Sequence, residues 1–118
     1  MRSSQAVRST IKNAAKILYY DLLDEEPQKW EAKTIDQSYA VQQTSMTNEA
    51  FRFVASTYIV CENDHGFPPV YQETFGELAV SRIRRTSSGH SPMLSHTATL
   101  AAMMDETVRP AVQTRGIS

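Results

Sequence analysis

Cysteine and glycine are scarce in this sequence, and long apolar runs are absent. The 118 residues include one cysteine, Cys61, and four glycines. A single cysteine cannot form a disulfide within the chain, so a disulfide-stabilised scaffold is excluded. Because no run of about 18 apolar residues occurs, no transmembrane helix is expected. The length also falls short of the roughly 200 residues or more that a barrel or a large doubly wound enzyme needs.

An excess of charge of either sign is also lacking. Twelve Lys and Arg residues against thirteen Asp and Glu residues leave a formal net charge of -1. A nearly neutral chain has no overall field that would attract nucleic acid or an anionic membrane, so neither is expected as a partner. Arg82, Arg84 and Arg85 form a local basic patch, which is more typical of a solvated strand face than of a nucleic-acid contact.

The N-terminal segment has no unbroken apolar core of the kind found in signal peptides. Its first 20 residues carry Arg, Ser and Lys but no acid, which is compatible with an organelle transit peptide. A docked amphipathic helix explains the same pattern. We therefore expect a cytoplasmic protein, and an unpaired cysteine suits a reducing compartment.

Apolar periodicity predicts helices in the first half of the chain. A set of apolar residues recurring every three or four positions predicts one helix over residues 4–23. These residues are Val7, Ile11, Ala14, Leu18 and Leu22. A second helix is expected from Asp24 to Gln37, with Asp24 as its cap and Pro27 in its first turn. After a polar connector, a short helix is expected from Asn48 to Val54.

The second half alternates between strand and helix patterns. The β-branched and aromatic run from Thr57 to Cys61 predicts a short buried strand. A helix is expected over 69–77, because Pro68-Pro69 opens it, and a second strand over 79–85. The last helix is expected over 96–108, with Ser95 as its cap and Pro110 ending it.

The alternation is the unit of a parallel sheet and predicts an α/β fold. We expect a helical, lid-like segment at 1–54, a β-α-β-α part at 55–110 and a frayed tail at 111–118. Two strands cannot make a stable parallel sheet, so the sheet is expected to be incomplete. Its open edge would suit a second copy of the chain or a partner chain.

Asp64 and His90 are the residues most suggestive of chemistry. Each follows a predicted parallel strand at its carboxyl end, where the ligands and catalytic groups of open α/β sheets gather. A carboxylate beside an imidazole fixes its tautomer and prepares it as a general base. Each residue alone also has an ordinary explanation, because Asp is common in turns and a loop His is commonly solvated.

Other candidates carry weaker patterns. Ser91 lies in Gly89-His90-Ser91-Pro92-Met93, which begins like an esterase nucleophile elbow. Met93 occupies the place of the final glycine, and Pro92 lacks the N–H that would help to stabilise an oxyanion. Cys61 is expected to be a small core residue.

His65 could form a metal cluster with Asp64 and His90, but metal-ligand spacing is lacking. No metal site or cofactor is therefore predicted.

Three stretches together resemble a known family. They are 58–64, the Pro68-Pro69 pair with Gln72, and 89–95. Their order and spacing resemble the C-terminal end of an α/β-hydrolase, closest to plant methylesterases, hydroxynitrile lyases and many fungal hydrolases. Upstream, residues 19–38 resemble the helical lid of that subgroup, so that the resemblance covers about residues 8–108.

By this resemblance, Asp64 matches the acid and His90 the base of a Ser-His-Asp triad. The order of nucleophile, acid and histidine in the family agrees with Asp64 preceding His90. Relatives hydrolyse small esters or related carbonyl compounds, and their lid walls an apolar substrate pocket.

The departure from the family concerns the nucleophile. Residues 1–57 contain no glycine, so the Gly-x-Ser-x-Gly elbow is absent. We therefore expect about half of a hydrolase, with little or no activity alone. The alternatives are a non-catalytic interaction module or dimer derived from the fold, and an unrelated small helical regulator.

Overall fold

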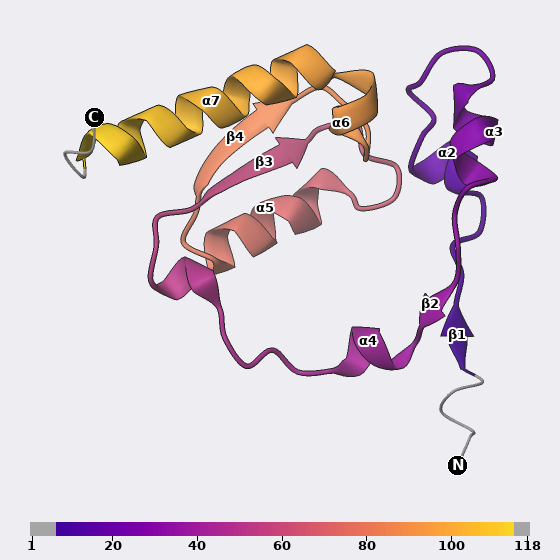
Figure 1. The fold of residues 1–118 in the computed structure, drawn as a ribbon, viewed down its shortest axis with the longest axis horizontal. Helices are drawn as coiled ribbons and strands as arrows, with labels where there is room; N and C mark the ends of the chain where they lie inside the picture. Colours follow the sequence, from indigo (N-terminus) through magenta and orange to yellow (C-terminus); the bar gives the residue numbers. More distant parts are fainter. Residues whose placement is uncertain (1–6, 115–118) are drawn as a thin grey trace.

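The computed structural model of the chain describes residues 7–114 as a series of short elements around one parallel strand pair (Figure 1). In chain order the elements are β1 (Arg8–Ser9), α2 (Ala14–Ile17), α3 (Glu26–Glu31), β2 (Gln37–Ser38), α4 (Ala40–Gln43), the 3-10 turn η1 (Ala50–Arg52), β3 (Thr57–Cys61), α5 (Pro69–Leu78), β4 (Arg82–Thr86), α6 (Pro92–Ser95) and α7 (Thr97–Thr114).

Strands β3 and β4 pair in parallel, in a register that runs from Thr57 opposite Arg82 to Cys61 opposite Thr86. Helix α5 connects them, so this part of the chain is a mixed α/β unit of two parallel strands alternating with helices. The bounds of β3 and the parallel pairing are confirmed predictions. The parallel strand pair does not fit the helical fold of the third alternative, a small helical regulator.

The second strand begins three residues later than predicted. Ala79 caps α5, and Val80 follows with a φ of 52°, donating its N–H to the Glu77 carbonyl. This turn uses residues 79–81 to reverse the chain, so the strand begins at Arg82. The helix preceding it, predicted over 69–77, extends one residue further to Leu78.

Helices lie on both faces of the strand pair. Successive strand residues point to opposite faces, so neighbouring arginines meet different helices. Arg85 forms an ion pair with Glu73 of α5, whereas Arg84 pairs with Glu106 of α7. Figure 1 shows the two helices on opposite sides of the strands. Two of the three arginines in the predicted basic patch are thus engaged in ion pairs within the fold.

Helix α5 approaches the strands most closely at Gly76. A Cβ built at this position would lie 3.3 Å from Tyr58 Cβ and would overlap Ile83 Cδ1. Tyr58 and Ile83 are register partners, so one glycine sits over one cross-strand pair. The missing side chain therefore sets the distance between helix and sheet.

The helix predicted over 4–23 is wrong for the residues that the structure describes. Asn13 adopts the left-handed conformation, with φ 58° and ψ 38°, so α2 begins only at Ala14 and makes a single turn. Beyond it, Tyr20 and Asp21 contact the second half of the chain. Tertiary contacts therefore override the periodic pattern. Residues 4–6 of the predicted helix lie outside the described residues.

The second predicted helix is shorter than expected. Its first turn contains Pro27, as predicted, but α3 ends at Glu31. Asp24 does not cap the helix, because it has a φ of 52° and Glu25 takes the cap position. The chain then enters β2, which pairs antiparallel with β1.

Two of the shorter segments also differ from the predictions. The expected polar connector is partly helical, since α4 covers Ala40–Gln43. The short helix predicted over 48–54 is reduced to η1.

The last helix differs at both ends from the prediction. Ser95 belongs to α6 and does not cap α7, which begins at Thr97. Pro110 does not end α7 either, since the helix continues to Thr114; one missing N–H removes a single helical bond. The expected tail at 111–118 is thus helical as far as it is described.

The face of α7 that packs inward also differs from the predicted one. The predicted apolar face included Met104 and Val108, yet both are more than half exposed. Met103, one position earlier, is buried. The sheet therefore contacts a neighbouring face of the helix.

The chain has an open shape with a small core. Its radius of gyration is 17.2 Å, whereas a compact domain of this length would have about 13–14 Å. Among the described residues, the buried hydrophobic side chains are Ala14, Ala15, Val60, Cys61 and Met103. Strand β3 is bonded only to β4, so its other edge has no neighbouring strand within residues 7–114.

Candidate active site

The loops that follow β3 and β4 are tied together beyond the ends of the strands. Glu62 donates its N–H to the Thr86 carbonyl at 2.9 Å, and Asn63 donates to the Ser88 carbonyl at 3.1 Å. The Asn63 side chain adds a bond to the Ser87 carbonyl at 2.6 Å. Because the hydrogen-bonded ladder continues into the loops, the residues that follow it are held side by side.

Asp64 is the first residue after this ladder, and its side chain is only 4% exposed. Its Oδ1 accepts the backbone N–H groups of Gly66 at 2.8 Å and Phe67 at 2.9 Å. Such local bonds are typical of an Asp in a turn and fix the direction of the carboxylate. Asp64 therefore forms the turn with one oxygen, and this turn holds the carboxylate in a fixed direction.

His90 meets this carboxylate from the neighbouring loop. Its Nδ1 lies 2.9 Å from Asp64 Oδ2 and 3.1 Å from Oδ1. An ionised carboxylate only accepts hydrogen bonds, so Nδ1 must carry the proton and donate it. In the neutral ring, Nε2 then keeps a free lone pair. The His90 side chain is 42% exposed, which leaves the ring open to a reacting group.

The structure thus brings together the two residues that the sequence singled out. Each comes from the carboxyl end of a parallel strand, as predicted from its position. Their catalytic role stays a prediction.

The role of Gln72 in the site was not predicted, although the residue is one of those that carry the family resemblance. Its side chain is buried, and its Oε1 accepts the Cys61 N–H at 2.7 Å. Its Nε2 donates to the carbonyls of Cys61 at 3.0 Å and Phe67 at 2.8 Å. The amide therefore replaces a neighbouring strand at the last residue of β3.

A signal for Gln72 existed in the sequence. Gln72 and Gly76 are four residues apart in α5 and so share one helix face, and both are buried. A buried glutamine beside a glycine that packs on a sheet needs polar partners, and the backbone at the end of β3 supplies them.

A cavity of about 300 Å³ lies at the site, along the edge of β3 that has no neighbouring strand. Thr57, Ile59 and Cys61 line its length, and Asp64 and His90 lie at the same cavity. The imidazole is therefore part of a recess that could hold a small molecule.

Neither Cys61 nor Ser91 is placed as a nucleophile. Burial raises the pKa of the Cys61 thiol, which keeps it in the less nucleophilic protonated form. Ser91 is buried before α6, and its hydroxyl makes no hydrogen bond to the His90 ring among the described contacts. These positions are in line with the sequence patterns, which favoured neither residue as a nucleophile.

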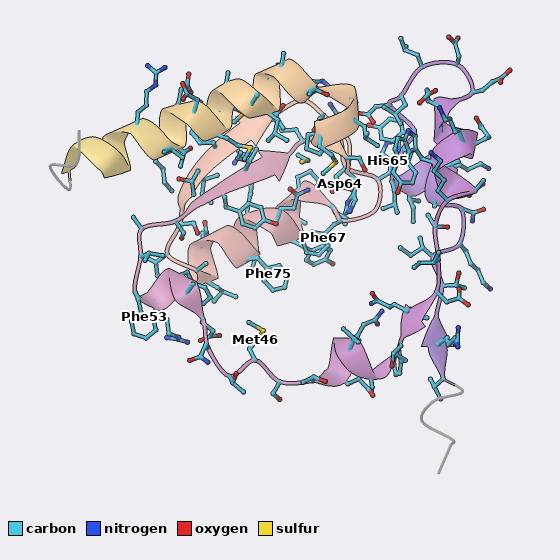
Figure 2. All side chains as sticks on the ribbon, viewed as in Figure 1. Met46, Phe53, Asp64, His65, Phe67 and Phe75 are labelled. Carbon is cyan, nitrogen blue, oxygen red and sulfur yellow. The ribbon has the colours of Figure 1, made fainter. Side chains whose placement is uncertain are left out.

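His65 points away from the proposed acid. Its ring stacks on Tyr20, with centroids 3.6 Å apart and planes 4° apart, and it lies on the side of the N-terminal segment (Figure 2). Within residues 7–114, no group of three His, Cys, Asp or Glu side chains is arranged to bind a metal ion. The alternative of a cluster with Asp64 and His90 is therefore wrong for the described part of the chain.

Comparisons with known proteins give no assignment: no protein-family model matches the chain, and no curated protein matches it. The resemblance to the α/β-hydrolases therefore stays a prediction from the sequence. In the described part of the chain, every helix is too short or too polar to cross a membrane.

Replacement of Gln72 by leucine tests the buried amide. Gln72→Leu leaves the N–H and the carbonyl of Cys61 without partners, and each unsatisfied buried group costs about 1–3 kcal/mol. We expect the free energy of unfolding in urea to fall by at least that amount. Gln28→Leu is the matched control, because Gln28 is exposed in α3 and should change it by no more than about 0.5 kcal/mol. Equal effects of the two variants would contradict the assigned role.

Proposed function

We propose that this chain carries the acid and the histidine of an acyl-transfer centre of the α/β-hydrolase type. The observation that supports this most directly is the hydrogen bond from His90 Nδ1 to Asp64 Oδ2, 2.9 Å long, between loops that follow adjacent parallel strands. The order of the two residues and the resemblance of the surrounding sequence agree with that proposal.

The chemistry follows from the tautomer of the imidazole. With Nδ1–H directed at Asp64, His90 Nε2 can take a proton from a hydroxyl nucleophile as it attacks an ester carbonyl. The same nitrogen then returns the proton to the leaving alcohol. Asp64 remains ionised and stabilises the imidazolium that forms between the two steps.

The proposed substrate is a small, apolar ester or a related carbonyl compound. The cavity beside His90 has the volume for a small molecule, about 300 Å³, and aromatic Tyr58 and Phe67 contribute to its lining. In this proposal residues 1–54 act as the lid. Their contacts with the loops that carry Asp64 and His90 support a position over the site.

The nucleophile is the part that this sequence does not supply. No glycine occurs in residues 1–57, so no elbow of the Gly-x-Ser-x-Gly kind can form there. The proposal therefore assigns the serine and the oxyanion hole to a polypeptide segment outside these 118 residues.

Hydrolysis of p-nitrophenyl acetate tests whether the chain needs a nucleophile from another segment. The purified chain is expected to hydrolyse the ester no faster than its His90→Ala variant, because a general base without a positioned nucleophile and oxyanion hole contributes little. A robust rate that His90→Ala abolishes would contradict the proposed dependence on a second segment.

The genomic DNA upstream of the Met1 codon provides the complementary experiment. The proposal expects an in-frame strand, a Gly-x-Ser-x-Gly elbow and a helix there. A protein that includes them should hydrolyse the ester and lose at least about 10³-fold of its rate on His90→Ala substitution. An extended protein whose hydrolysis does not depend on His90 would contradict the triad.

A second candidate function, a non-catalytic interaction module or dimer, is favoured by the edge of β3. Because Glu62 N–H faces β4, the backbone groups of Thr57, Ile59 and Cys61 face the other way. Gln72 bonds those of Cys61, but those of Ile59 have no bonded partner among the described residues. An edge of this kind can pair with another strand.

Exposed apolar side chains on α5 and on the segment that leads to β3 favour the same function. Phe75 in α5, Phe53 and Met46 are 53%, 81% and 75% exposed. In Figure 2 the first lies on α5, while the other two lie on the segment that leads to β3. Exposed apolar surface of this kind is typical of an association surface.

Sedimentation equilibrium distinguishes the two functions. An interaction module should form a dimer or larger species at micromolar concentration, and Ile59→Pro should weaken it, because proline removes the N–H at the free edge. Val41→Pro is a control in the first half, away from β3. A monomer that unfolds cooperatively would contradict the interaction module.

A further inference from the structure

We propose that Asp21 is a positioning residue for His90, acting through the peptide group of Gly89. This inference rests on the proposed function, because it concerns the imidazole of the same centre. Asp21 Oδ2 accepts the Gly89 N–H at 2.8 Å, across 68 positions in the sequence. Gly89 directly precedes His90, so the bond fixes the backbone from which the imidazole extends.

The neighbouring residue, Tyr20, bonds to the loop that carries Asp64. Its hydroxyl donates to the carbonyl of Asn63, the residue before Asp64. Tyr20 and Asp21 therefore attach one short segment to both loops, one carrying the acid and the other the histidine. We call these two residues the clamp.

The fit of the clamp depends on the absence of a side chain at position 89. A Cβ built on Gly89 would lie 3.0 Å from Tyr20 Cε1 and 3.1 Å from both Asp21 Cγ and Oδ1. These distances are shorter than most contacts of a Cβ atom, so a side chain at position 89 would require Tyr20 and Asp21 to shift by a few tenths of an ångström. Glycine thus favours the close approach of the clamp at this position, and no unusual φ is involved.

The two oxygens of the Asp21 carboxylate differ in their bonding. Its Oδ1 is buried without a hydrogen-bond partner among the described residues, and such a group is costly. The His96 ring lies beside the other oxygen, with its Nδ1 3.9 Å from Oδ2, and that nitrogen is already in contact with Ser95 Oγ at 2.9 Å. A carboxylate kept in this setting is explained by the bond that its other oxygen makes to Gly89.

Nuclear magnetic resonance of the ¹⁵N-labelled His90 ring tests the proposal without substrate. In the unaltered chain, Nδ1 should show the shift of a protonated nitrogen and Nε2 that of a bare one. Asp21→Ala should loosen the loop and bring both shifts toward intermediate values. The exchange of the Nδ1 proton with water should become about tenfold faster or more, as expected for the loss of a hydrogen bond to a charged group.

Matched variants separate positioning from folding. Asp21→Asn keeps an oxygen acceptor and should restore the ring shifts of the unaltered chain. Asp36→Ala removes an exposed carboxylate from the same half of the chain and should leave them unchanged. If Asp21→Ala does not fold, Gly89→Ala is measured instead, because its Cβ displaces the clamp and should produce the same intermediate shifts.

Two results would overturn the proposal. The first is unchanged ring shifts in a folded Asp21→Ala chain or, if that chain does not fold, in Gly89→Ala. The second is an Asp21→Asn variant whose ring shifts are as altered as those of Asp21→Ala. Either would leave the Asp64–His90 pair intact as a proposal. A bare Nδ1 in the unaltered chain would instead contradict the proposed function itself. The two failures are therefore distinguishable.

Discussion

The parallel register of β3 and β4 is the constraint on which the rest of the site depends. Cys61 lies opposite Thr86, and the hydrogen-bonded ladder continues through Glu62 and Asn63 into both loops. Asp64 and His90 leave that ladder at nearly the same level, which accounts for a carboxylate and an imidazole 2.9 Å apart. A shift of one residue would turn each strand side chain to the opposite face and break the match of the loops.

The open edge of β3 leaves backbone N–H and C=O groups without a neighbouring strand, and a side chain of α5 bonds some of them. Gln72 supplies both hydrogen bonds that a neighbouring strand would give to Cys61, and its Nε2 also lies 3.4 Å from Asp64 Oδ2. Ile59, two residues earlier, receives no such substitute among the described residues. The edge of β3 therefore has its backbone hydrogen bonds at Cys61, beside the Asp64–His90 pair, and lacks them at Ile59 within the described residues.

The second half of the chain could largely be predicted from its sequence, because its signals are local and mutually consistent. A β-branched run bounded by turn residues gave β3, and Pro68-Pro69 gave the start of α5. The first half could not be predicted, because apolar spacing does not reveal a left-handed Asn13. Nor does it reveal that Tyr20 and Asp21 contact residues more than 40 positions away.

The candidate site shows the same division. Asp64 and His90 could be singled out because strand ends in a parallel sheet converge. The role of Asp21 and the bonding partners of Gln72 could not be predicted, because they depend on backbone groups that come close only in the folded chain. Sequence patterns identify residues that carry chemistry more readily than residues that hold them in place.

The central claim is that Asp64 fixes the tautomer of His90. The most direct measurement is the ¹⁵N–¹H correlation spectrum of the His90 ring in the unaltered chain and in Asp64→Ala. The account predicts a protonated Nδ1 and a bare Nε2 in the unaltered chain, and loss of that fixed tautomer when the carboxylate is removed. The same ring spectrum in both proteins would contradict it.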